Sequence, residues 1–140
     1  NQRICEASQG SMRRALLALE CTTVSANGQL FESTDVKLPE WELFVRDIVR
    51  NIHEEQSPGR LMLVRAQLYQ LITNCIPADI ILQEIARGLC AGAPDMLQHQ
   101  IMRWRAFYDH RIATGTKPIF HLEAFVAKIM AIVKAMKSAQ

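Results

Sequence analysis

The sequence has 140 residues, of which 49% are hydrophobic and 21% are charged, so it can bury the core of one or two small globular domains. A net charge of +2 is too small to indicate a nucleic-acid surface by itself, and no apolar run is long enough to span a bilayer. No signal peptide is visible, and the chain starts at Asn1 inside a helical pattern, so we expect a piece of a longer protein.

The first part of the chain predicts two short helical pieces followed by a linker. Residues 1–8 read as the tail of a helix, and Ser11 is a suitable N-cap for a second helix over residues 12–21. The apolar side of this second helix consists of Leu16, Leu17 and Leu19. Residues 22–38 have no helical period and predict a linker, with a hairpin around Asn27-Gly28 as the alternative.

The rest of the chain, residues 39–138, carries five helical patterns separated by short breaks. Ser57-Pro58 restarts the helix after the first of them, because serine is a good N-cap and proline suits the first helical position. The later breaks fall at Ile76-Pro77, Gly92-Ala93-Pro94 and Thr114-Gly115-Thr116, where Gly115 predicts a glycine cap. The predicted fold class is therefore all-α: a five-helix bundle preceded by a short helical piece of another domain.

One charged pair and the four cysteines in the chain are expected to have structural roles rather than chemical ones. Glu42 and Arg46 are spaced to form an i, i+4 ion pair. The cysteines have neither CxxC pairing nor metal-ligand spacing, which favours free and mostly buried thiols over disulfides. They are Cys5, Cys21, Cys75 and Cys90, of which Cys75 continues the core stripe of its helix.

The last helical pattern, residues 117–138, is apolar on two sides. Its bulky stripe consists of Ile119, Leu122, Val126, Ile129, Val133 and Met136, widened by Phe125, Met130 and Ile132. Its opposite side consists of Ala124, Ala127, Ala131 and Ala135, with Lys128 on one border and Glu123 on the other. Since a surface helix should be polar on its outer face, two interpretations stay open: coverage by a partner, or burial inside a single bundle.

Few residues suggest binding chemistry. In the segment from Gly10 to Ala15, Arg13 lies in the first helical turn, where it can point towards an anion with the helix N-terminus; two solvated arginines are the alternative. Arg103-Trp104-Arg105 could suggest nucleic acid, but Trp104 falls on an apolar stripe, so a core role is the better interpretation for it. The sequence contains no Gly-rich phosphate loop, no HExxH motif and no nucleophile elbow.

Two sets of motifs carry a family resemblance. Residues 8–16, Ser-Gln-Gly-Ser-Met-Arg-Arg-Ala-Leu, resemble the sensor-two motif at the start of the last lid helix in clamp-loader ATPases of the AAA+ class. The remainder resembles the C-terminal collar domain of eukaryotic replication factor C small subunits, the third of them most closely. The segments that carry this second likeness are Glu55-Gln56-Ser57-Pro58, Val64-Arg65, Leu68-Tyr69, Cys75-Ile76-Pro77, Phe107-Tyr108-Asp109-His110-Arg111 and His121-Leu122-Glu123-Ala124-Phe125-Val126-Ala127-Lys128.

The resemblance implies a domain order and two kinds of site. Residues 1–21 would end the AAA+ lid domain, 22–38 would be a linker and 39–138 the oligomerisation collar. Arg13 would be the sensor arginine at the terminal phosphate of bound nucleotide, while Arg14 would be structural. The predicted subunit interface consists of Ala124, Ala127, Ala131, Ala135 and Lys128, although the two faces of that helix could be reversed.

The resemblance also implies a function and partners. The collar would assemble a nuclear hetero-pentamer of replication factor C subunits that loads the sliding clamp onto primer–template DNA in replication and repair, without a membrane. ATP or ADP and Mg would bind the full-length protein, whereas this piece would hold no cofactor and be no enzyme. Self-association of the isolated piece is expected to be possible. A freestanding helical adaptor for partner peptides is the alternative. A third interpretation is a nucleic-acid-binding helical domain that uses Arg60, Arg65, Arg103 and Arg105.

Overall fold

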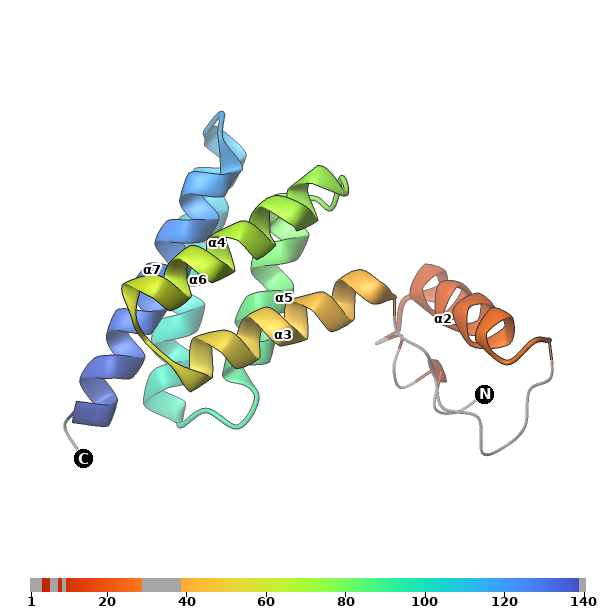
Figure 1. Cartoon of the computed structure of the whole chain (residues 1–140), viewed down its shortest axis with the longest axis horizontal. Helices are drawn as coiled ribbons and strands as arrows, with labels where there is room; N and C mark the ends of the chain where they lie inside the picture. Colours follow the sequence, from red (N-terminus) through yellow and green to blue (C-terminus); the bar gives the residue numbers. More distant parts are fainter. Residues whose placement is uncertain (1–3, 6–7, 9, 29–38, 139–140) are drawn as a thin grey trace. The chain divides into compact units, whose positions relative to one another are not determined.

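The computed structural model describes residues 4, 5, 8, 10–28 and 39–138, and divides the chain into two compact units, residues 1–43 and 44–140 (Figure 1). Within the described residues it contains six helices, α2 to α7, and no strand. The predicted all-α fold class is therefore confirmed. Most of the helix tail predicted over residues 1–8, and residues 29–38 of the predicted linker, lie outside the described residues.

The first unit contains α2 (Met12–Ser25), which begins at the predicted N-cap. The Ser11 hydroxyl accepts a hydrogen bond from the Arg14 backbone N–H at 3.5 Å. The predicted end at Cys21 is wrong by four residues, because the Thr22 hydroxyl donates to the Ala18 carbonyl at 2.6 Å and so is satisfied within the helix. Asn27-Gly28, both with positive φ, close the helix instead of turning a hairpin.

The predicted apolar side of α2 is not a core face within the described residues. Its three leucines are exposed: Leu16 by 59%, Leu17 by 44% and Leu19 by 36%. Ala18 and Thr22 are buried instead, so α2 packs in its unit through its small residues. Periodicity alone identified an apolar side but could not identify which side is covered.

The second unit is a helical bundle in which α7 packs against three of the other helices. It contains all but the first four residues of α3 (Glu40–Glu54), followed by α4 (Pro58–Thr73), α5 (Ala78–Cys90), α6 (Asp95–Thr114) and α7 (Pro118–Ser138). Helix α7 contacts α4, α5 and α6, and α5 also packs along α6 (Figure 1). The fully buried large side chains are Ile48, Ile52, Leu68, Leu71, Ile81, Leu82, Ile85, Leu89, Ile101, Leu122, Phe125 and Ile129.

The start of α4 confirms the sequence prediction, whereas its end does not. Ser57 is the N-cap, its hydroxyl accepting from the Arg60 N–H at 3.2 Å, and Pro58 is the first helical residue. The helix ends at Thr73, and Cys75 takes a left-handed φ of 59° in the turn that follows. Cys75 is therefore exposed and does not continue the core stripe.

The prediction of mostly buried thiols is wrong, while the prediction of free thiols is confirmed. All four cysteines are free; Cys5 and Cys75 are exposed, and Cys21 and Cys90 are partly exposed. Cys90 is the last residue of α5 and Cys75 lies in the turn after α4, where the surrounding chain covers less of the side chain.

Two glycines allow close packing in the second unit. Gly115 is the C-cap of α6, which confirms the predicted glycine cap, and its φ of −94° is one that other residues also adopt. A Cβ there would lie 2.6 Å from His121 Nε2 and 2.8 Å from the Arg111 carbonyl oxygen, so space rather than backbone conformation requires the glycine. In α5, a Cβ on Gly88 would lie 2.7 Å from Val49 Cγ2 of α3.

Candidate functional site

The bulky stripe of α7 faces the core of its own domain. Ile119, Leu122, Val126, Ile129 and Val133 are all buried, as are Phe125 and Met130. Met136, at the end of the stripe, is only partly covered. The assignment of this face to the core is therefore confirmed, and the alternative of reversed faces is excluded.

The alanine side of α7 forms an exposed apolar row. Ala124 and Ala127 are partly exposed, and Ala131 and Ala135 are exposed. Phe120, four residues before Ala124 and thus on the same side, is 51% exposed. We call this set, Phe120, Ala124, Ala127, Ala131 and Ala135, the outer row; Phe120 was missed from the sequence, although its spacing could have revealed it.

Neighbouring helices hold the charged side chains along both borders of the outer row. On one border, Arg65 of α4 donates to the Glu123 carboxylate at 3.5 Å. On the other, the Lys128 ammonium lies 4.5 Å from the centre of the Trp104 ring of α6. A cation–π contact at an exposed site contributes about 0.5–1 kcal/mol, enough to favour this position of the lysine. The outer row therefore has small side chains in its middle and anchored charges at its edges.

Helix α6 places an aromatic cluster beside Lys128. Trp104, Phe107 and Tyr108 contact one another, with ring centroids 5.1–6.1 Å apart, and Tyr108 meets the buried Phe125 of α7 at 6.1 Å. Trp104 and Tyr108 are half-buried, so their predicted place on the apolar stripe is confirmed only in part. Cations of the same domain also contact these rings: Arg111 of α6 lies over Phe107, and Lys128 of α7 lies over Trp104.

The two arginines at the start of α2 differ in their surroundings. The Arg14 guanidinium donates to Glu42 Oε1 at 2.7 Å, and the two side chains are only 29% and 11% exposed. Glu42 therefore pairs with Arg14, where the sequence predicted Arg46. This contact supports the structural role expected of Arg14. Arg13 is exposed in the first turn of α2, and its role in nucleotide sensing stays a prediction.

The pKa values of two groups outside the outer row, the Glu55 carboxyl and the Cys90 thiol, are shifted by their local surroundings. A hydrogen bond from Ser57, and then the nearby Arg60 guanidinium, lower the pKa of the Glu55 carboxyl. Partial burial raises the pKa of the Cys90 thiol, an effect that Arg105 opposes. Neither group belongs to the outer row, so these shifts reflect local packing rather than chemistry at the candidate interface.

The described residues form neither a metal site nor a membrane-spanning helix. In these residues, His, Cys, Asp and Glu side chains form no cluster of three or more able to hold a metal ion. None of the described helices is long and apolar enough to cross a bilayer. The strongest structural feature that remains is the outer row of α7.

These features define an all-helical domain whose last helix is covered on one face and open on the other. Residues 41–137 match the family model described as "Replication factor C subunit 3, C-terminal domain". The matched range includes nearly all of α3 to α7. The chain therefore belongs to the replication factor C family.

Relatives from three kingdoms agree with the family match. The chain is 48% identical over 132 residues to replication factor C subunit 5 of Neurospora crassa. It is 41% identical over 133 residues to subunit 3 of Arabidopsis thaliana, and 39% identical over 134 residues to human subunit 3. Each alignment covers 94% of this chain but 37% of the relative, so the chain spans little more than a third of their length.

Proposed function

We propose that residues 39–138 are the collar through which a replication factor C subunit assembles into a pentameric clamp loader. The observation that carries this proposal is the outer row of α7, an exposed apolar face on a helix whose other face forms the domain core. Small side chains let a neighbouring helix approach closely, and interaxial distance depends on the side chains at the contact. Ala124, Ala127, Ala131, Ala135 and Lys128 would contact the neighbouring subunit.

The complete assembly would work as an ATP-driven machine in the nucleus. It would open the sliding clamp and place it on primer–template DNA during replication and repair. In the full-length subunit, ATP or ADP with Mg would bind outside the collar, and Arg13 would contact the terminal phosphate of that nucleotide. The chemistry of a guanidinium beside a helix N-terminus supports this placement of Arg13.

The assembly proposal is tested by placing a charge in the outer row. Ala127→Arg and Ala131→Arg are introduced into the full-length subunit, which is then co-purified with the other four subunits. We expect loss of the pentamer, because a buried unpaired guanidinium costs several kcal/mol. Ala113→Arg, at an exposed site near the end of α6, is the matched control and should assemble normally. Intact pentamers with both row variants would favour the freestanding adaptor instead.

The sensing proposal needs its own measurement. Arg13→Ala in the full-length subunit should weaken nucleotide binding, and ATP should lose more affinity than ADP because the terminal phosphate is the expected contact. Arg13→Lys separates charge from the planar guanidinium. Unchanged affinities for both nucleotides would reject the role of Arg13 while leaving the assembly proposal intact.

A further inference from the structure

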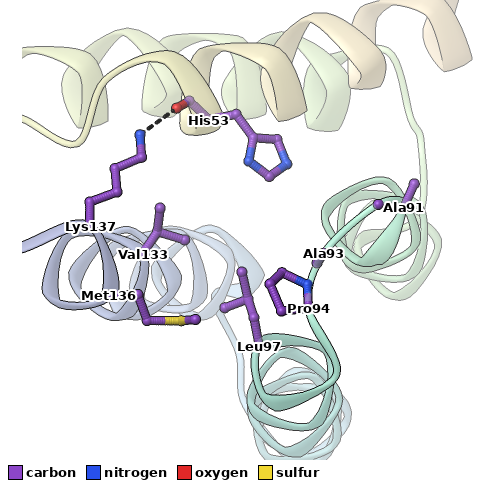
Figure 2. Close-up of a pocket in the computed structure, with 9 residues that line it drawn as sticks. His53, Ala91, Ala93, Pro94, Leu97, Val133, Met136 and Lys137 are labelled. Carbon is purple, nitrogen blue, oxygen red and sulfur yellow. Dashed lines mark hydrogen bonds between the residues drawn. The ribbon is translucent and has the colours of Figure 1, made fainter. Parts of the chain in front are cut away.

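The second unit contains a pocket that the outer row does not use. It encloses about 230 Å³ between the end of α3, the α5–α6 connection and the end of α7 (Figure 2). Its lining includes His53, Pro94, Leu97, Val133, Met136 and Lys137. Because no outer-row residue lines it, the pocket would remain available when α7 contacts another subunit.

The floor of the pocket is apolar, and the pocket is small. Leu97 and Val133 are each 6% exposed, and Figure 2 shows them with Met136 and Pro94 on the side opposite His53. Pockets for drug-sized molecules enclose about 300–1,000 Å³, so this one suits a smaller group. A single side chain of leucine size fits both the volume and the apolar floor.

One rim of the pocket carries a positive charge that no carboxylate of the described residues pairs with. The Lys137 ammonium donates to the His53 carbonyl oxygen at 3.0 Å and to Gln56 Oε1 at 3.1 Å, both uncharged acceptors. An ammonium has three donors, which leaves one N–H for a further acceptor. Among the described residues, none that lines the pocket is acidic and none forms an ion pair with Lys137.

The His53 ring adds a neutral polar group across from the apolar floor. Partial burial, and then the Lys137 charge, lower its pKa below the ordinary value of 6.5, which favours the neutral form of the ring. A neutral imidazole offers one donor and one acceptor to a bound peptide. The pocket thus combines an apolar floor, an imidazole ring that can form hydrogen bonds, and a lysine ammonium with one N–H left to donate.

We propose that this pocket binds an acidic segment of a partner protein, with one apolar side chain on the floor and an adjacent carboxylate at Lys137. The apolar floor would not repay the desolvation of a small inorganic anion, while a purely apolar ligand would leave the lysine without its acceptor. A carboxylate beside an apolar side chain satisfies both. The inference goes beyond collar assembly, because it uses a different surface.

The test uses the full chain and defined peptides. Acetyl-Gly-Asp-Leu-Asp-Gly-amide is titrated while the methyl NMR signals of Leu97 and Val133 are followed. We expect saturable shifts at millimolar or lower concentrations. Replacing both Asp by Asn should weaken binding about threefold to fivefold, and replacing Leu by Ala about tenfold.

Variants of the protein test whether the peptide binds in this pocket and whether Lys137 selects its carboxylates. Lys137→Gln keeps a polar group but removes the charge, so it should abolish the preference for the Asp peptide over the Asn peptide. Lys134→Gln, one turn earlier on α7 and outside the pocket, is the matched control and should retain that preference. Ala91→Phe, at the exposed rim, should fill the pocket and eliminate the methyl shifts.

Three outcomes would overturn the proposal. Equal affinity for the Asp and Asn peptides would show that Lys137 selects no carboxylate. Shifts confined to other methyl groups would place the peptide elsewhere. Self-association of the chain that depends on Lys137 and Ala91 would show that a second copy, and not an acidic partner segment, occupies the pocket.

Discussion

Gly88 in α5 offers a quantitative test of packing in the second unit. In the interior of a helix, Gly→Ala ordinarily stabilises a protein by about 1 kcal/mol. Here the new Cβ would lie 2.7 Å, 3.3 Å and 3.4 Å from three side-chain atoms of Val49 in α3. Carbon atoms pack best at about 3.5–4.0 Å, so the nearest contact is well inside the repulsive range.

The expected magnitude follows from two opposing effects. Valine is stiff at χ1 in a helix, so Val49 cannot rotate away without leaving its preferred rotamer. Overpacking of this kind costs about 1–3 kcal/mol and opposes the helix-propensity gain of about 1 kcal/mol. We therefore expect Gly88→Ala to lower the free energy of unfolding by up to about 2 kcal/mol, or Tm by up to about 10 °C.

A double-mutant cycle separates the two effects. Val49→Ala removes the two methyl carbons nearest to the new Cβ, so in that background Gly88→Ala should stabilise the domain by about 0.5–1 kcal/mol. Gly59→Ala in α4 is the matched control, because its nearest neighbour would be the Ser57 hydroxyl at 3.9 Å. Urea denaturation followed by circular dichroism measures all four variants. A similar stabilisation by Gly88→Ala in both backgrounds would refute the close-packing argument.

Three other predictions follow from the described side chains. Because the pKa of folded His53 lies below 6.5, the folded state binds fewer protons than the unfolded state, so stability should fall as pH drops through that value; Lys137→Gln should raise the NMR-measured pKa of His53, and an unchanged value would exclude the charge effect. The thiol of Cys90 should react with iodoacetamide more slowly than exposed Cys75, because burial raises its pKa; mass spectrometry of labelled peptides checks the order, and faster labelling of Cys90 would contradict it. Gly115→Ala should destabilise by about 1–3 kcal/mol, because a backbone oxygen 2.8 Å away cannot move aside; unchanged thermal unfolding would refute this.

The repeat in α7 was predictable because helical geometry fixes which residues share a face. Leu122 and Ile129 fall on one side and Ala124 and Ala131 on the other, whatever the helix packs against. Ser57-Pro58 was equally informative, since both residues favour the same position at a helix start. Such local rules extend to fold class, but they do not decide which of the two apolar faces of α7 meets the core.

Features that depend on tertiary contacts could not be predicted in this way. Thr22 looked like a linker residue until its hydroxyl was seen to bond within α2. Gly115 was predictable as a helix cap, but the lack of space beside His121 and the Arg111 carbonyl was not, because it depends on the packing of α7 against the end of α6. The hydrogen bonds of Lys137 could not be predicted from the sequence, because its partners at residues 53 and 56 lie more than eighty positions away.

The three proposed sites share no side chain, and this decides how their tests can be combined. Arg13 lies in the first unit, the outer row covers the exposed side of α7, and the pocket lies at the end of the same helix beside His53. Effects of well-separated residues usually add within about 0.5 kcal/mol. If Ala131→Arg abolished assembly while peptide binding at Lys137 persisted, the domain would still be folded and the loss would belong to the outer row. If both were lost together, unfolding would explain the result, and the interface assignment would fail its test.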